Sequence, residues 1–256
     1  FVIEVKNVTK KYGSFVAVDD INFSINDGEV VGFLGPNGAG KTTTMNIITG
    51  FIEQTEGNVI VNGFDTVKKP KKAKQEIGYM PEGVPLYMDL TVKEFVTYMA
   101  ELRKVDKKIK KDKVQNVLKE TGLIEMQNKL IKNLSRGQKQ RVSLAGTLVG
   151  DPKVLILDEP TNGLDPAGIH EIRNLIKTLP KRYDCTVLIS SHMLSEIELL
   201  ADDIGILNHG RLLFEGSLDD LKLTAHQAGF ENDNLEEMFL SMIDEDNANR
   251  KQRLKL

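Results

Sequence analysis

The first part of the chain alternates apolar and polar residues in short runs that are separated by turn signals. Phe1–Val5 and Ile21–Ile25 have the two-residue period of a strand that buries one face. Tyr12-Gly13, between these runs, contains a glycine of the kind that turns favour. The pattern predicts antiparallel strands that lead into the continuous apolar run Val30–Leu34.

Between about residues 84 and 150 the apolar residues recur at helical intervals instead. One predicted helix follows Thr91, which has the spacing of a capping box with Glu94. Another follows Ser135, which has the same spacing with Gln138, and a further amphipathic helix lies between the two. We expect this segment to form an inserted α-helical subdomain.

Two continuous apolar runs follow, Val154–Leu157 and Thr186–Ile189, with a helical stretch between them. Buried strands that alternate with helices are typical of a parallel sheet covered on both faces. The sequence therefore predicts an α/β fold with a mainly parallel sheet flanked by helices. The predicted fold also contains an N-terminal antiparallel β subdomain and the inserted helical subdomain.

The composition is that of an ordinary globular protein, because 40% of the 256 residues are hydrophobic and 28% are charged. The formal net charge of -3 argues against nucleic-acid binding by the whole surface, and no nucleic-acid partner is expected. Cys185 is the single cysteine and starts an apolar run, which predicts a buried side chain in a reducing compartment.

No apolar run approaches the roughly 20 residues that a membrane-spanning helix needs. The chain starts with strand-like residues instead of a signal peptide. We therefore expect a cytosolic protein without a transmembrane segment of its own, whose membrane role comes through a partner.

A glycine-rich loop directly follows the run Val30–Leu34. Glycines adopt backbone angles that other residues avoid, so successive N–H groups of such a loop turn inward around a phosphate. Lys41 would reach the β- and γ-phosphates and Thr42 would offer its hydroxyl to Mg2+, at the positive end of the following helix. The loop predicts the nucleoside triphosphate site of a P-loop NTPase core. It consists of Gly35, Pro36, Asn37, Gly38, Ala39, Gly40, Lys41, Thr42 and Thr43.

Two acids, Asp158 and Glu159, follow the run Val154–Leu157 without a gap. Both therefore emerge at the carboxyl end of a buried strand, where open α/β sheets gather their ligands. Asp158 suits Mg2+ and Glu159 suits the orientation of an attacking water. The alternative is that the two acids only cap the next helix.

The segment Leu134-Ser135-Arg136-Gly137-Gln138 completes a set of motifs. With it the chain resembles the nucleotide-binding subunit of the ATP-binding cassette (ABC) family over about residues 2–216. The motifs stand in the order of that family: the phosphate loop, this signature segment, the strand that ends at Glu159, Gly163-Leu164-Asp165, and His192.

The resemblance implies that two copies of the chain meet head to tail and sandwich two ATP molecules. Ser135, Gly137 and Gln138 would then face the nucleotide of the other copy, and Asp165 would reach across the dimer. A signature at a helix N-terminus suits this role, because free N–H groups there bind anions.

The resemblance also assigns roles to two isolated residues. Tyr12 would stack on the adenine, although a single tyrosine of this kind is otherwise a half-buried core residue. His192 would contact the γ-phosphate and help to hold the catalytic water, although a lone histidine at a strand end is otherwise a satisfied polar residue.

Two positions depart from the family pattern. Glu82 stands where the family usually has the glutamine that senses Mg2+ and couples to the membrane partner; a carboxylate there would bind the metal more strongly but repel the phosphates. Arg136 replaces the first glycine of the signature pair, and it either adds a cation toward the partner's nucleotide or points to solvent.

Residues 1–216 are predicted to form the nucleotide-binding domain, with residues 217–256 as a helical extension and basic tail. Asn234–Ile243 predicts a short amphipathic helix that resembles the tails of export-type members in the antibiotic-resistance and drug-efflux branch. The closing segment Arg250–Leu256 would touch anionic lipid or form a frayed, solvated terminus.

The predicted function is that of an ATP-hydrolysing motor subunit that binds ATP and Mg2+. It would form a homodimer at the cytoplasmic face of the cell membrane and drive a separate integral membrane permease, with export as the expected direction. A soluble ATPase of the same family with a non-membrane partner is the alternative. A cassette that binds ATP without turnover is disfavoured by the complete set Lys41, Asp158, Glu159 and His192.

The permease is expected to dock on the surface around Glu82, Pro85, Tyr87 and Met88, which joins the nucleotide core to the helical subdomain. Exposed apolar side chains at such a joint indicate an interface. The alternative is that Tyr87 and Met88 pack inside the helical subdomain.

Overall fold

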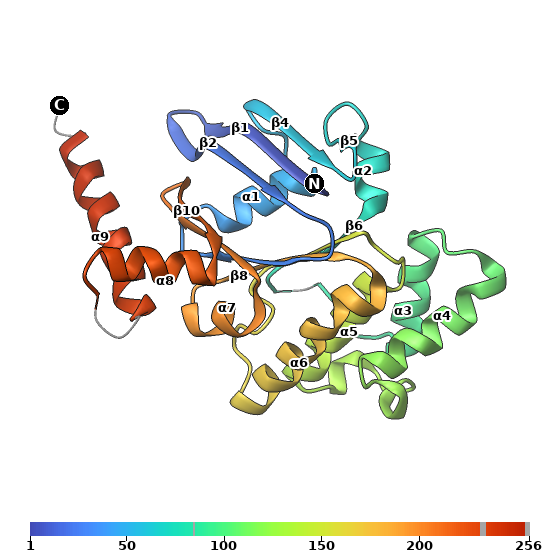
Figure 1. The fold of residues 1–256 in the computed structure, drawn as a ribbon. Helices are drawn as coiled ribbons and strands as arrows, with labels where there is room; N and C mark the ends of the chain where they lie inside the picture. The colour runs from blue at the N-terminus through green and yellow to red at the C-terminus, as the bar shows by residue number, and fades with distance from the viewer. Residues whose placement is uncertain (84, 231–233, 254–256) are drawn as a thin grey trace.

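The protein has two β-sheets, seen in a computed structural model that describes residues 1–83, 85–230 and 234–253 (Figure 1). A four-stranded antiparallel sheet has the order β2-β1-β4-β5, and a six-stranded sheet has the order β10-β9-β3-β8-β7-β6. The smaller sheet contains β1 (Ile3–Tyr12), β2 (Phe15–Ile25), β4 (Glu56–Val61) and β5 (Phe64–Asp65). The larger contains β3 (Val30–Leu34), β6 (Ile77–Met80), β7 (Val154–Leu157), β8 (Thr186–Ser191), β9 (Asp203–Asn208) and β10 (Arg211–Ser217).

The larger sheet is parallel except for β10, which pairs antiparallel with β9. Its central strands β3, β7 and β8 are buried along their whole length, as their unbroken apolar sequences predict. Because these strands run in parallel, their carboxyl ends meet at one edge of the sheet, and the loops that leave them gather there.

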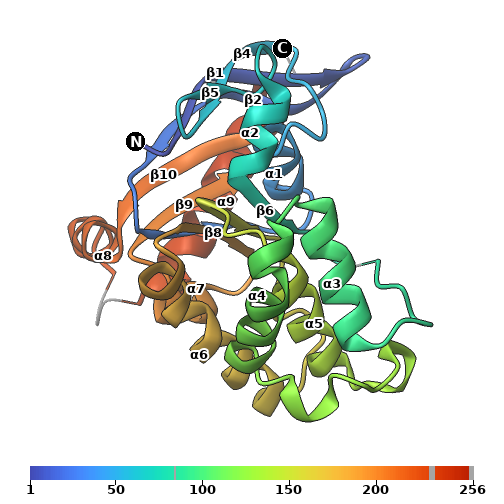
Figure 2. The same ribbon diagram turned by 90° about the vertical axis from the view of Figure 1, so that its right-hand side faces the viewer.

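Helices cover both faces of this sheet. They are α1 (Lys41–Ile48), α2 (Pro70–Glu76), α3 (Val92–Leu102), α4 (Lys107–Glu120), α5 (Arg136–Leu148), α6 (Pro166–Tyr183), α7 (Leu194–Leu200), α8 (Leu218–Gln227) and α9 (Leu235–Arg253), with short 3-10 turns at Ile124–Met126 and Ile131–Asn133. One apolar core joins α1 to both sheets, and a second lies between the larger sheet and helices α3 to α9. In Figure 2 the antiparallel sheet lies above the larger sheet, and α3 to α7 lie below it.

Several local predictions are confirmed. Helices α3 and α5 begin with capping boxes, Thr91 with Glu94 and Ser135 with Gln138. Helix α1 starts at Lys41 as predicted. The domain boundaries drawn at residues 84, 150 and 216 stay predictions.

The last helix is longer than predicted. The apolar spacing indicated a helix over Asn234–Ile243, but α9 continues to Arg253. The extra turns are polar, so no apolar periodicity marks them. The first four residues of the predicted basic tail, Arg250–Arg253, therefore belong to a helix, and residues 254–256 lie outside the described part of the chain. None of the helices within the described residues is both long and apolar enough to cross a membrane.

Candidate nucleotide site

A cavity of about 550 Å³ opens over the phosphate loop, between β3 and α1. Gly40 stands at the start of α1 with a φ of 105°, and a Cβ there would lie 3.0 Å from the carbonyl oxygen of Ala17. Only glycine combines that backbone angle with so close an approach. The cavity is lined by Phe15, Ala17, Asn37, Gly38, Ala39, Gly40, Lys41, Thr42, Thr43, Glu82, Glu159, Asn162 and His192.

Lys41 is 6% exposed, and its ammonium lies at the base of this cavity. Its Nζ donates to the carbonyl oxygens of Gly35 (2.6 Å) and Pro36 (3.3 Å), within the loop itself. It also lies 3.4 Å from Oε1 of Glu159. A buried cation held by these acceptors can exchange them for an anion that enters the cavity.

Ser190, on β8, fixes the two acids that follow β7. Its hydroxyl donates to Oδ1 of Asp158 (2.5 Å) and accepts from the backbone N–H of Glu159 (2.9 Å). Asp158 is fully buried, and its Oδ2 has no hydrogen-bond partner within the described part of the chain. Such a buried carboxylate oxygen has a strong requirement for a cation or donor.

Glu159 connects Lys41 to His192. While its Oε1 faces the ammonium, its Oε2 lies 2.9 Å from Nδ1 of His192, which follows the end of β8. The three residues that the sequence analysis proposed as catalytic thus form one row along the cavity. The helix-capping alternative for Asp158 and Glu159 is wrong, because α6 is capped by Asp165. Glu159 instead lines the cavity.

Burial, and next the charge of Asp158, raises the pKa of Tyr79 to about 12. The phenol therefore keeps its proton at neutral pH and donates it to Oδ1 of Asn46 at 3.1 Å. This bond ties β6, which precedes Glu82, to helix α1, which follows the phosphate loop.

Glu82 lines the cavity from the segment after β6. Its Oε1 accepts a hydrogen bond from Nδ2 of Asn162 at 2.7 Å, and Asn162 lies in the turn after Glu159. Glu82, which stands where the family usually has a glutamine, is therefore hydrogen-bonded to the loop that follows Asp158 and Glu159. Asn162 has no distinctive sequence signal, because an asparagine in a turn has many ordinary explanations.

Tyr12 does not line the cavity. It is 51% exposed at the end of β1, with Nζ of Lys10 5.0 Å from its ring centroid. Both adenine stacking and the half-buried alternative stay predictions. The aromatic side chain that does line the cavity is Phe15, two residues beyond the Gly13 turn, which the sequence analysis missed because it lies in an ordinary strand pattern.

The signature residues lie away from this cavity. Ser135 caps α5 by accepting from the Gln138 N–H, and the Gln138 side chain accepts from the Ser135 N–H. Asp165 caps α6 in the same way, accepting from the Gly168 N–H at 2.9 Å. Neither these residues nor Gly137 line the cavity. Within one chain they are helix starts on a different part of the surface.

Arg136 is exposed, which is compatible with both of its predicted alternatives. Its guanidinium lies over Gly163 of the same chain, so closely that a Cβ at position 163 would collide with it. On the next turn of α5, Nε2 of Gln140 donates to the carbonyl oxygen of Pro160 at 2.8 Å. Helix α5 is therefore fastened at two points to the loop between Glu159 and α6.

Glu196 is a further residue that the sequence analysis missed. It is buried on α7, and its Oε2 accepts from the hydroxyls of Thr161 (2.7 Å) and Ser191 (3.0 Å). It thereby joins the loop after Glu159 to the residue before His192. An acid in a short helix gives no sequence signal for burial, because most such acids are solvated.

Comparison with known proteins identifies the family. The ABC transporter family matches residues 18–162, which is more than half of the chain. The chain belongs to this family. The match includes the phosphate loop, the signature and Glu159.

Two curated relatives and one solved structure are informative. The chain is 42% identical over 221 residues to the bacitracin transport ATP-binding protein BcrA of Bacillus licheniformis, covering 86% of this chain and 71% of that protein. It is 36% identical over 242 residues to the lantibiotic transport ATP-binding protein SrtF of Streptococcus pyogenes, covering 94% and 97%. A dimeric ATP-binding cassette in a post-hydrolysis state with ADP and Pi matches with a TM-score of 0.75 and 28% identity, covering 84% and 98%.

These findings confirm the predicted fold and activity. The chain has the fold of an ABC ATPase, and it is an ATP-hydrolysing motor subunit of an ABC transporter. ATP-driven dimerisation and ATP hydrolysis power the movement of substrate, and the chain works with a membrane component.

Proposed function

We propose that this subunit hydrolyses ATP with Mg2+ at the phosphate-loop cavity and thereby drives the export of peptide antibiotics by a separate permease. The row Lys41–Glu159–His192 along the cavity is the observation that carries the proposal. The names of the relatives BcrA and SrtF, which describe bacitracin and lantibiotic transport, support this substrate class. The subunit would lie at the cytoplasmic face of the cell membrane.

In this proposal Lys41 leaves Glu159 and binds the β- and γ-phosphates when ATP enters. Glu159 then has a free carboxylate oxygen, which accepts the proton of the attacking water. His192, whose Nδ1 is 2.9 Å from the other carboxylate oxygen of Glu159, would hold that carboxylate in place and contact the γ-phosphate. The remaining residues of the loop, from Gly35 to Thr43, surround the phosphates with their N–H groups. Tyr12 or Phe15 would support the adenine.

The residues present fit a magnesium ion. Oδ2 of Asp158 is buried and unpaired within the described residues, and the next residue, Glu159, lines the cavity together with Thr42. In the described ranges no three side chains of His, Cys, Asp or Glu gather to hold a metal by themselves. This is the pattern expected for Mg2+, which protein sites hold through one or two carboxylates together with substrate phosphates. Bound there beside Thr42, Asp158 and Glu82, the ion would neutralise the developing charge on the phosphates.

A second copy of the chain would complete each site. Ser135, Gly137, Gln138 and Asp165 lie outside the chain's own cavity, so they remain available for the nucleotide of the other copy. The free N–H groups at the start of α5 suit a γ-phosphate. Arg136, held over Gly163, would keep the signature and the Asp165 loop in a fixed relation in that dimer.

The permease is proposed to dock on an apolar depression formed mainly by the segment that follows Glu82 in the chain. Tyr87 is 55% exposed, and its ring packs edge-on against Tyr98 at 5.6 Å between centroids. Met88 is also exposed, which argues against the alternative that these residues are packed inside the helical subdomain. The depression has a volume of about 560 Å³ and is lined by Leu86, Tyr87, Met88, Asp89, Leu90 and Tyr98.

The double variant Tyr87→Ser/Met88→Ser tests this function. Co-expressed with its permease, the parent should co-purify with that polytopic protein and show stimulated ATPase activity. The variant should lose most of the stimulation while its basal hydrolysis and melting temperature stay near the parent's. Leu102→Ser is the matched control, since Leu102 is an exposed apolar residue at the far end of α3.

A parent that never co-purifies with a membrane protein would favour the soluble alternative. A variant that remains folded and couples fully would refute the docking surface. If the double variant melts several degrees below the parent, the single variant Met88→Ser decides, because Tyr87 also packs 6.3 Å from the buried ring of Phe95.

A further inference from the structure

The turn between β9 and β10 lies directly against the phosphate loop. Its central residues His209 and Gly210 have φ angles of 47° and 79°, which is the tight two-residue connection of a hairpin. The Gly210 N–H donates to the carbonyl oxygen of Ala39 at 2.8 Å. A Cβ on Gly40 would lie 3.1 Å from the Cα of Gly210. The second half of the phosphate loop therefore rests on this turn.

The first half of the loop touches the same hairpin. A Cβ on Gly35 would collide with the carbonyl oxygen of Leu207, which precedes Asn208 at the end of β9. The turn is also fixed from β2, because the Asp19 N–H donates to the carbonyl oxygen of Gly210 at 2.8 Å. Since both ends of the phosphate loop contact residues 207–210, a shift of the hairpin tip would move the loop.

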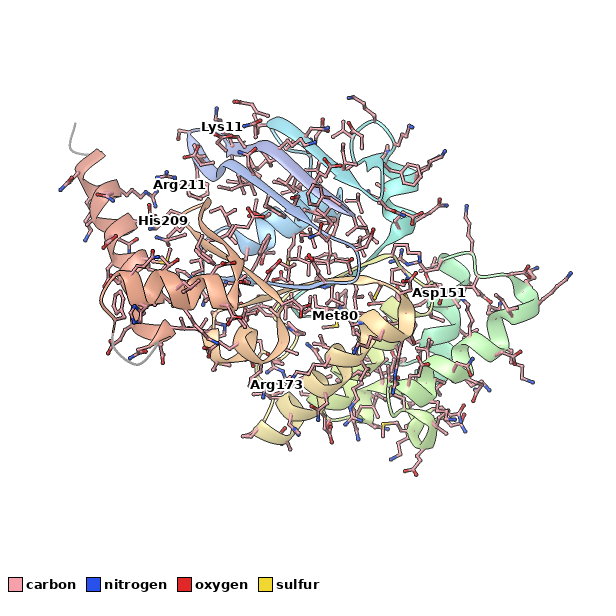
Figure 3. The ribbon with its side chains drawn as sticks, in the orientation of Figure 1. Lys11, Met80, Asp151, Arg173, His209 and Arg211 are labelled. Carbon is pink, nitrogen blue, oxygen red and sulfur yellow. The ribbon has the colours of Figure 1, made fainter. Side chains whose placement is uncertain are left out.

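Helix α9 holds this hairpin tip from the opposite side. Nδ2 of Asn208 donates to Oδ2 of Asp246 (3.0 Å) and to Oδ1 of Asn247 (3.2 Å). Nε2 of His209 lies 2.8 Å from the same Asn247 oxygen, and Arg211 lies 3.7 Å from Oδ1 of Asp246. Figure 3 shows His209 and Arg211 on the part of the hairpin that lies beside α9.

These contacts are partly shielded from water. Asn208 is 2% exposed, and the Asp246 side chain is 11% exposed. Removing both acceptors therefore takes from the buried Asn208 amide the two partners it has on α9, which costs more than losing a surface contact. Asp246 and Asn247 thus contact three of the four residues of the hairpin tip, which comprises residues 208–211.

The two ends of α9 have different roles in the fold. Its first turns bury Leu235, Met238 and Phe239 in the core with Leu221 of α8. In the described part of the last turns the side chains are mostly polar, and the contacts of Asp246 and Asn247 go to the hairpin tip. The polar contacts can therefore change without removing the apolar anchor.

We propose that α9 is a positioning element for the phosphate loop: through Asp246 and Asn247 it fixes the β9–β10 turn on which Ala39 and Gly40 rest, and so sets the affinity for ATP. Both are positioning residues, since neither lines the nucleotide cavity. The inference rests on the proposed binding of ATP by the phosphate loop. If α9 positions the loop in this way, any contact that displaces α9 should change the affinity of the protein for ATP.

The test compares ATP binding by the full-length parent, Asn247→Ala and Asp246→Ala/Asn247→Ala. We expect the dissociation constant for ATP to rise about three- to tenfold, the effect of one or two lost hydrogen bonds. The KM for ATP should rise with it, while kcat at saturating ATP stays within about twofold, because the catalytic row is untouched. Hydrogen exchange should accelerate at residues 207–211 and 35–41.

Two controls separate positioning from a general loss of structure. Glu245→Ala removes an exposed acid from the same helix and should leave the ATP affinity unchanged. Asn247→Asp keeps an oxygen acceptor for Asn208 and His209, so it should restore binding, although an acid near a helix C-terminus is unfavourable for the helix itself.

Parental ATP affinity in both alanine variants would overturn the inference, and so would an equal loss in Glu245→Ala or a failure of Asn247→Asp to restore binding. If the double variant does not fold, comparing the ATP affinity of Asn247→Ala with that of Asn247→Asp tests the inference in the same way. A parent that does not bind ATP in this assay would instead refute the proposed function.

Discussion

Glu159 is held at the nucleotide site by its backbone as well as by its side chain. Its φ of 48° is uncommon for a residue other than glycine and costs on the order of 1–3 kcal/mol. The Ser190 hydroxyl accepts a hydrogen bond from the Glu159 N–H. Lys41 and His192 each lie beside one of the two carboxylate oxygens of Glu159. Strain that the surroundings hold in place in this way is typical of functional positions.

Glu159→Gln should therefore keep ATP binding and lower the rate of ATP hydrolysis by about 10² to 10⁴, the range for losing a general base. The amide has the shape of the carboxylate and can hold a water, but it cannot accept the proton. The measurement is steady-state phosphate release together with the dissociation constant for ATP.

Glu198→Gln makes the same change at an exposed position of α7 and should hydrolyse ATP at the parental rate. Turnover by Glu159→Gln above about a tenth of the parent rate would contradict the assigned role, because the loss of a base has a larger effect.

At the scale of elements, the two ends of β8 differ: the carboxyl end contacts the nucleotide site and the amino end is packed in the core. Its body is buried on both faces, and Ser190 and His192 lie at its carboxyl end. At the opposite end, Cys185 is buried as predicted, and its thiol lies 3.7 Å from the carbonyl oxygen of Leu179 on α6. Burial, and next the charge of Asp184, raises the pKa of this thiol to about 11.

The single thiol should therefore be inert in the folded protein. At pH 8 we expect alkylation of Cys185 to be about 100-fold slower than that of an exposed thiol, since the thiolate is the reactive form. Denaturant should abolish the protection. In addition, the unfolded thiol ionises first, so its contribution to stability is present below pH 9.0 and is lost as the pH rises toward about 11.

A variant with Cys185→Ala and Asn249→Cys, which moves the thiol to the exposed side of α9, supplies the rate for an accessible cysteine. Equal rates in the parent and this variant would mean that the end of β8 opens readily in the folded state.

At the scale of the whole molecule, neither the backbone angle nor the packing of the described residues requires a glycine at position 137 of the signature. Its φ lies outside the positive region, and a Cβ there would meet no atom of the described residues within 4 Å. Glycine near the start of α5 is unfavourable for the helix by up to about 1 kcal/mol relative to alanine. In the proposed dimer, a second copy that approaches this surface with its nucleotide would give the missing reason.

Gly137→Leu should accordingly fold with a melting temperature at or above the parent's, but fail to dimerise with ATP. The dimer is best measured by light scattering in the Glu159→Gln background, where slow hydrolysis keeps ATP bound. Lys111→Leu adds the same side chain to an exposed position of α4 and should dimerise normally. An ATP-bound dimer of the Gly137→Leu variant would exclude this surface from the interface.

The sequence by itself determined the features that depend on neighbours along the chain. Unbroken apolar runs predicted the buried strands β3, β7 and β8, because a strand covered on both faces has no polar side. The spacing of Thr91 and Glu94 predicted the start of α3, because a cap is made within one turn. The phosphate loop and the acids after β7 were predicted for the same reason, since their chemistry lies in contiguous residues.

Only the tertiary structure decided which distant residues meet. Nothing in the sequence indicates that Ser190 bonds to Asp158, that Glu196 joins two loops, or that Arg136 lies over Gly163. The attachment of α9 to the phosphate loop through Asn208 likewise joins segments that are far apart in sequence. Single polar residues have no periodicity, and their partners are selected by how the sheet, its loops and its covering helices pack together.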